Sequence, residues 1–397
     1  MIAWTSSPVT EAIQGLRGLL EDPAWQASAH APVIRAALRQ HLGDYDPVTR
    51  MLAAQALHLI EPDGEQRLEL ARQRLLAEPH PHVRAVLFVQ LGWLVGRDAA
   101  AVDRLVAELA DSGQWPLAAS APAAAPRAVD GRDAADSQDD AIVKGELLEV
   151  AASLLLLLAV RYEQPAAASI INRWFSHPLD DSEAFHQAAF QLRAMGMLAT
   201  DREGDTVAAK AFALLREATE EIVTTVEAQL AGGQRDNDVW NSALRLADTV
   251  ADQLYAASGA LQERQATASE QQLEPSSRAN TDLFSLAMPL LEQLARVHHP
   301  RITHRLVETL AHLAEHDPKR VLLAVHRAVA PGQGYQYESM AVDLIVSLIQ
   351  RYLADYRNLV TTDEEALTAL RELIEVFVRA GWPSAITLAY QLPDAFR

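Results

Sequence analysis

The feature that most constrains this chain is a helical unit that occurs twice in succession between Asp46 and Leu94. Pro47 and Pro81 lie 34 residues apart, and Arg50 and Arg84 have the same separation. A period of roughly 30 to 50 residues built from helix pairs is typical of an α-solenoid. The alternative is an ordinary helical bundle in which the similarity arose by chance.

Apolar residues follow each proline at offsets of six, ten and thirteen, which places them on one face of a helix. The same offsets occur a third time after Pro300. The three sets are Ala53, Leu57 and Ile60; Leu87, Leu91 and Leu94; and Leu306, Leu310 and Leu313. Proline suits the first helical turn because its missing N–H would have no partner there, and Asp46 precedes Pro47 as an N-cap. Because one helix pair cannot bury its apolar face alone, the units must stack, and the pattern predicts an all-α fold.

The first unit resembles the first helix of a HEAT repeat, and the second unit is similar to it. The residues that carry the resemblance are Arg50, Ala53, Ala54, Ala56 and Leu57 in the first unit, and Val83, Arg84, Leu91 and Gly92 in the second. The resemblance implies an α-solenoid of HEAT-like helix pairs. It also implies a polar ladder between stacked repeats that would include Asp46, Arg50 and Arg84. His80 stands where the family has Asp.

Three short segments near the C-terminus carry a second resemblance. Residues 334–339 (Gly-Tyr-Gln-Tyr-Glu-Ser), 351–357 and 380–383 look like the C-terminal end of large bacterial antiphage-defence ATPases of the STAND type. In those proteins an NTPase module precedes a helical-repeat region that senses a ligand or partner. The resemblance implies a sensor or scaffold role, and it implies that any NTPase activity resides on another segment or chain.

The formal charge of −19, from 53 acidic residues against 34 Lys and Arg, describes an anionic surface. Such a surface opposes nucleic acid and anionic membranes, because phosphate binding needs clustered cations. The chain has no cysteine, which excludes thiolate metal sites and cysteine nucleophiles and fits a cytoplasmic location. The most apolar run, Leu148–Val160, is too short to span a bilayer. We therefore expect a cytoplasmic protein without a membrane partner.

Composition divides the chain into three parts. Residues 1–112 are expected to form N-terminal HEAT-like repeats, and residues 141–397 a C-terminal helical-repeat array. The intervening residues 113–140 contain three prolines, many alanines and five aspartates, which indicates a flexible acidic linker. A second polar stretch, 258–280, is expected to be a loop or a frayed helix. Near the C-terminus, Thr362 and Glu365 have the spacing of a capping box.

Motifs for known chemistry are missing. The sequence has no GxxxxGK[ST], no HExxH and no GxSxG. Gly332 and Gly334 precede an expected helix, but without a lysine they are better explained by an interhelical turn. We therefore expect a non-catalytic protein without a cofactor.

One constellation invites a functional hypothesis. His304, Glu308, His312 and His316 recur every four residues, so their side chains share one helix face. Two such residues can chelate zinc or iron, but the four span roughly 18 Å. A metal site would need ligands from a neighbouring helix, such as His326, and would make the chain a metal-dependent enzyme.

The preferred hypothesis is that this face contacts a protein partner, because it forms a mildly basic patch on an acidic body. The predicted contact residues are Arg301, His304, Arg305, Glu308, His312, His316, Lys319 and Arg320. The sequence thus predicts a non-catalytic helical-repeat scaffold or sensor in a bacterial defence or signalling assembly. Its partner would be a protein such as an NTPase or nuclease subunit.

Overall fold

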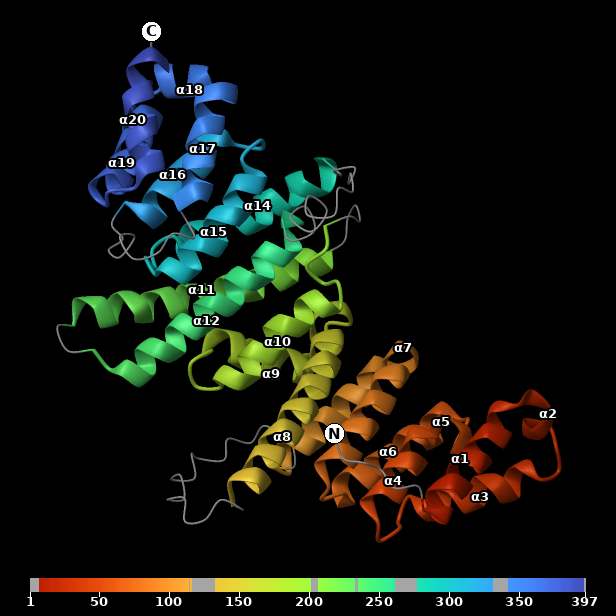
Figure 1. Cartoon of the computed structure of the whole chain (residues 1–397). Coiled ribbons are helices and arrows are strands. Elements are labelled where there is room, and N and C mark those ends of the chain that lie inside the picture. The colour runs from red at the N-terminus through yellow and green to blue at the C-terminus, as the bar shows by residue number, and fades with distance from the viewer. Residues whose placement is uncertain are drawn as a thin grey trace. The chain divides into compact units, whose positions relative to one another are not determined.

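The computed structural model describes residues 7–113, 115, 133–200, 206–232, 235–260, 277–330 and 342–395. Within these ranges every regular element is helical and no strand occurs (Figure 1). The predicted fold class, all-α and built from packed helix pairs, is confirmed. The chain divides into two compact units, Met1–Ile171 and Asn172–Arg397.

The N-terminal unit contains two layers of stacked helices. Its elements are α1 (Pro8–Glu21), α2 (Pro23–Gln26), α3 (Ala31–His41), α4 (Pro47–Gln55), α5 (Leu57–Ile60), α6 (Gly64–Ala77), α7 (Pro81–Asp111), α8 (Asp133–Leu156), the π-helical turn η1 (Leu157–Arg161) and the start of α9 (Pro165–Ser176). In one layer α1 packs on α4 and α4 packs on α7. In the other layer α6 packs on the second half of α7.

Contacts within this unit follow the period of the sequence. Four of them join residues that are 33 to 36 positions apart, close to the 34-residue spacing of the two prolines. They are Gly64 with Arg97, Gln55 with Gln90, His58 with Trp93, and Arg72 with Glu108. The two copies therefore stack in register, as solenoid repeats do.

Helix α7 consists of two helices joined at Asp98, where the backbone leaves the helical region (φ −150°, ψ 78°). The Asp98 carboxylate accepts a hydrogen bond from the Ala101 amide at 2.9 Å and so caps the second half. By length and composition alone α7 could cross a membrane. A core helix passes the same test, and α7 packs against α4, α6 and α8.

The boundaries between parts differ from those expected. Most of the predicted linker at 113–140 lies outside the described residues, but α8 begins at Asp133, before the expected start at Ala141. Helices α8 and η1 pack on α7. Residues 141–171 therefore belong to the N-terminal unit, and the C-terminal unit begins at Asn172.

Glu78 connects the two copies. The Arg50 guanidinium donates two hydrogen bonds to the Glu78 carboxylate, at 2.8 and 2.7 Å, and two more to the carbonyls of Asp44 and Tyr45. The Glu78 side chain is only 5% exposed, and its carbonyl lies 3.5 Å from Nη1 of Arg84. Arg50 and Arg84 thus converge on a glutamate that the HEAT resemblance did not indicate.

Two predicted caps have different outcomes. Asp46 accepts hydrogen bonds from the amides of Val48 and Thr49, which confirms it as the N-cap of α4. The capping box at Thr362 and Glu365 is wrong, because the N-cap of the helix that follows is Asp363. Thr362 ends the preceding helix, and its hydroxyl donates to a carbonyl within that helix.

One cap comes from a distant residue. Asp103, on the second half of α7, is 5% exposed. Its two carboxylate oxygens accept hydrogen bonds from the amides of Ala166 and Ala167, at 3.0 and 2.8 Å. Asp103 therefore satisfies the first turn of α9.

The described part of the C-terminal unit is also helical throughout. Its elements after α9 are α10 (Ser182–Ala194), α11 (Thr206–Ala231), α12 (Asn237–Ala257), α14 (Ser277–Leu294), α15 (Pro300–Leu313), α16 (Pro318–Val329), α17 (Val342–Asp355), α18 (Arg357–Thr362), α19 (Glu364–Arg379) and α20 (Pro383–Ala395). The third proline unit forms α15 as expected, with Pro300 in its first turn and its three leucines fully buried. The segment 334–339 and the glycines at 332 and 334 lie outside the described residues.

Candidate partner-binding groove

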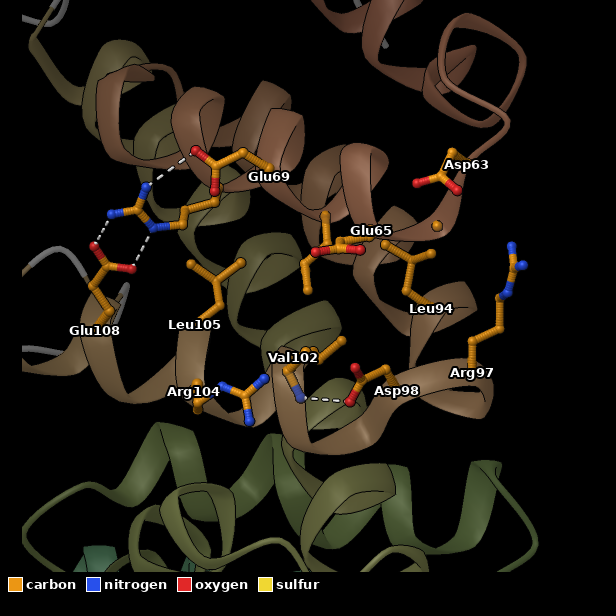
Figure 2. Close-up of a pocket in the computed structure, with 14 residues that line it drawn as sticks. Asp63, Glu65, Glu69, Leu94, Arg97, Asp98, Val102, Arg104, Leu105 and Glu108 are labelled. Carbon is orange, nitrogen blue, oxygen red and sulfur yellow. Dashed lines mark hydrogen bonds and ion pairs between the residues drawn. The ribbon is translucent and has the colours of Figure 1, made fainter.

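A groove of about 700 Å³ runs between α6 and the second half of α7, inside the N-terminal unit (Figure 2). Its floor is apolar and consists mainly of Leu94, Val102 and Leu105, which are all nearly inaccessible. Leu68 on α6 is half-buried and completes the lining. The volume of the groove lies within the range of ligand pockets. Because the floor residues are buried, the charged side chains around the groove would determine which ligand it selects.

The two helices that flank the groove run in the same direction. At one end Arg97 lies over the first turn of α6, where a Cβ on Gly64 would be 3.1 Å from its Nη1 atom. At the other end Arg72 of α6 meets Glu108 of α7 (Figure 2). Gly64 has no side chain, and this allows the guanidinium to approach the α6 backbone so closely.

A paired arginine closes the second end. Arg72 donates two hydrogen bonds to the Glu108 carboxylate, at 2.6 and 2.5 Å, and lies 3.3 Å from the Glu69 carboxylate. The pKa of Glu108 is lowered, chiefly by the hydrogen bonds from Arg72. The pKa of Arg72 is raised by the same partner. These three charges are therefore committed to one another.

The acidic residues at the first end are also engaged. Asp63 accepts a hydrogen bond from the Gln66 amide at 2.9 Å and caps α6, as Asp98 caps the second half of α7. Glu65 is different, because it is exposed and forms no hydrogen bond or ion pair with any described residue. It is the one acid on the α6 side of the groove that is free to interact with a ligand.

Arg97 and Arg104 are the free cations of the groove. Both are exposed, and neither forms a hydrogen bond or an ion pair within the described part of the chain. Both lie on the α7 side (Figure 2). Burial lowers the pKa of the neighbouring Arg67, and the charge of Arg97 lowers it further. The groove thus presents two guanidinium groups and one carboxylate that have no partner among the described residues.

The cations predicted to contact a partner at α15 and α16 are placed differently. Arg301 lies 2.8 Å from the Asp248 carboxylate of α12, and Arg305 lies 3.1 Å from the Asp252 carboxylate of the same helix. Arg305 also pairs with Glu308 at 3.1 Å. Both arginines therefore link α15 to α12.

Lys319 and Arg320 have the same kind of partner. Lys319 lies 2.7 Å from the Asp363 carboxylate and 3.1 Å from that of Glu365. Arg320 donates two hydrogen bonds to the Glu292 carboxylate of α14, at 2.7 and 2.9 Å. Each of the four predicted cations thus meets a carboxylate of a neighbouring element. Their contact with a partner stays a prediction.

The histidines of this face do not converge on a common point. His304 lies 3.6 Å from the Glu308 carboxylate, His312 faces Gly259, and the ring of His316 lies 5.7 Å from that of Phe284. His326, the suggested additional ligand, pairs with Glu372 at 2.6 Å. Among the described residues no group of three or more His, Cys, Asp or Glu side chains is placed to hold a metal ion.

The sequence reasoning missed the groove because Arg97 and Arg104 belong to no motif. The repeat period was the available signal. A shift of about one period from the start of α6 leads to Arg97 and Asp98, and the same shift from Arg72 leads close to Glu108. The period therefore indicates which side chains meet across the groove, although it does not show which remain unpaired.

Comparisons with known proteins add little. No family model matches the chain, and no curated protein matches it. Among matching solved structures is the crystal structure of an engineered protein, a Northeast Structural Genomics Consortium target. It is 15% identical, the match covers 94% of this chain and 96% of that one, and the TM-score is 0.20. At that TM-score the likeness carries no structural or functional argument.

Proposed function

We propose that the protein is a non-catalytic helical-repeat scaffold that binds a protein partner. The observation that carries the proposal is the α6–α7 groove, in which Arg97 and Arg104 are exposed and without an internal partner. Stacked helix pairs provide extended surfaces for other proteins. Unpaired charges beside a surface groove favour recognition, because little internal bonding must be broken when a partner binds.

The cellular role is a finer part of the same proposal. The resemblance of residues 351–357 and 380–383 to defence ATPases supports a sensor or scaffold in a bacterial, cytoplasmic defence or signalling assembly. In this structure Arg351 donates to the Ala311 carbonyl at 3.0 Å, and the Tyr352 hydroxyl donates to the Pro318 carbonyl at 2.7 Å. Arg351 and Tyr352 therefore join α17 to α15 and α16. These contacts serve the fold, so residues 351–357 support the proposal only through their resemblance.

Affinity purification of the full chain from its native host, followed by mass spectrometry, tests the proposal. We expect a protein that co-purifies in constant proportion with the chain. The Arg97→Glu/Arg104→Glu double variant should lose that protein. The same purification with Arg301→Glu tests the predicted partner contact at α15 and α16. Arg301 suits this test because its side chain is 73% exposed, and the substitution reverses its charge. A chain that purifies alone and turns over a small molecule would contradict the scaffold.

A further inference from the structure

We propose that the α6–α7 groove binds a segment of the partner that carries two carboxylates, one for Arg97 and one for Arg104. The inference rests on the proposed function and specifies the chemistry of its partner. A guanidinium group has five N–H donors in a planar fork that matches the two oxygens of a carboxylate. The donors of Arg97 and Arg104 are not bonded to any other described residue.

The acids around the groove do not compete for these two arginines. Asp63 and Asp98 accept hydrogen bonds from helix amides, and Glu69 and Glu108 share Arg72. Each of these four carboxylates already has a donor with good geometry. The remaining acid, Glu65, lies on α6 next to Gly64, over which the Arg97 guanidinium is placed. The structure shows no hydrogen bond or ion pair between Glu65 and either arginine.

Arg97 and Arg104 are seven residues apart in the sequence and lie on either side of the helix break at Asp98. The regular rise of an α-helix therefore does not give the distance between them. Figure 2 shows Arg97 at the end of the groove and Arg104 further along the α7 side. Two glutamates seven residues apart on a helical segment, about 10 Å from each other, are a suitable first probe for this pair of arginines. An apolar residue between them would cover Leu68, which is still partly accessible.

The charge of the chain restricts the size of the ligand. With a formal charge of −19, the protein repels long polyanions such as nucleic acid. A short acidic segment avoids most of that repulsion, because charges beyond about 8 to 10 Å are screened at physiological salt. The groove therefore favours a local acidic motif of a protein over a nucleic acid.

Fluorescence anisotropy with the full chain tests this inference. The probe is a labelled synthetic helical peptide with two glutamates seven residues apart and leucines between them. The control peptide has glutamine in place of both glutamates. We expect the glutamate peptide to bind, and the Arg97→Gln/Arg104→Gln variant to lose about tenfold or more in affinity. Hydrogen exchange should show protection by the peptide in α6 and the second half of α7.

A matched variant separates the site from the overall charge. Arg216→Gln/Arg371→Gln changes the net charge equally, and both residues are exposed and unpaired among the described residues. It should bind the peptide as the wild type does. Equal losses in the two double variants, or a glutamine peptide that binds as well as the glutamate peptide, would overturn the inference. So would a phosphoserine peptide or an oligonucleotide that binds through Arg97 and Arg104 when the glutamate peptide does not.

The outcome is distinguishable from that of the scaffold proposal. If a partner co-purifies with the wild type and with Arg97→Glu/Arg104→Glu alike, and no acidic peptide binds, the groove chemistry is wrong while the scaffold stands. If no partner co-purifies under any condition, the scaffold itself fails.

Discussion

Two groups of cationic residues in this protein differ in whether they are paired with carboxylates. Those at α15 and α16 each meet a carboxylate of a neighbouring element, as Arg320 meets Glu292. Arg97 and Arg104 on α7 meet none among the described residues. The first group has more cations, four against two, yet the second offers more free donors. A basic patch is therefore available to a partner only where packing leaves it unpaired.

The packing explains the difference. Helix α15 lies against α12, and α16 lies against α14 and α19, and acidic residues of those neighbours face the cations. The α7 side of the groove faces α6, whose own acids are bonded at the two ends. Each paired cation should contribute to stability, and each free one should contribute mainly to binding. The following predictions test that distinction, from the largest expected effect to the smallest.

The largest effect is expected where pairing is most buried. Arg50→Ala removes four hydrogen bonds and leaves the buried Glu78 carboxylate without its charged partner, while the hydrogen bond from the His80 amide stays. The pKa of Arg50 is raised, chiefly by its hydrogen bonds to Glu78. We expect a loss of about 3 kcal/mol in the opening free energy of α4 to α7, because a buried carboxylate that loses its charged partner is costly. Native-state hydrogen exchange with mass spectrometry measures it for this unit alone. A loss below about 1 kcal/mol would place Arg50 with the surface pairs.

A smaller effect is expected for a paired cation of the α15–α16 group. Arg320→Ala removes the two hydrogen bonds to Glu292, in a pair that is partly exposed on both sides. We expect a loss of about 1 kcal/mol in the free energy of opening of α14 and α16. Glu292→Gln should cause most of the same loss, because both variants remove the same pair. A double-mutant cycle on the opening of α14 and α16 measures the coupling. Additive losses in the double variant would show that Arg320 acts without Glu292, and would remove the basis of the comparison.

The ion pair of Lys319 and Asp363 should show its effect through pH. The pKa of Asp363 lies below its ordinary value of 3.8, chiefly because Lys319 donates to its carboxylate. A lowered folded-state pKa adds stability above the ordinary value, and the contribution is lost as pH falls through the lowered one. We expect Asp363→Asn to lower Tm slightly at pH 7, while keeping the acceptor that caps α19. The difference from wild type should shrink as pH falls below 3.8 and disappear once Asp363 is protonated in the folded state. A difference that persists unchanged in acid would assign the effect to the cap.

No stability effect is expected for the free cations. Arg97→Gln/Arg104→Gln removes no internal bond, so the opening free energy of α6 and α7 should stay within about 0.5 kcal/mol of wild type. The same hydrogen-exchange experiment measures this opening free energy. A loss as large as that of Arg320→Ala would mean that these arginines hold the fold together, and the contrast between the groups would fail.

The sequence predicted the helical architecture well, because its signals are local. Pro47, Pro81 and Pro300 each begin a helix, and the apolar residues that follow them are buried. The break at Asp98 is local as well, because the Asp98 side chain caps the helix that follows it. These features depend on one residue and its neighbours within a few turns, where propensity and capping act.

The candidate site was less predictable, because pairing depends on residues far apart in the chain. Arg301 and its partner Asp248 lie 53 residues apart in the sequence, on α15 and α12, so no local pattern links them. The Thr362 cap failed for a related reason. The chain forms an additional short helix that ends at Thr362, and this moves the cap to Asp363.

The position of Asp103 imposes an order on assembly. Helix α9 receives its cap from a carboxylate 63 and 64 residues earlier in the chain, on a different helix. The first turn of α9 is therefore satisfied only after α7 has formed and its second half lies alongside. During synthesis the N-terminal residues emerge first, so α7 can be waiting when α9 leaves the ribosome. A chain that began to fold from α9 would lack that nucleus, and we expect vectorial synthesis to give native α9 faster than refolding from denaturant.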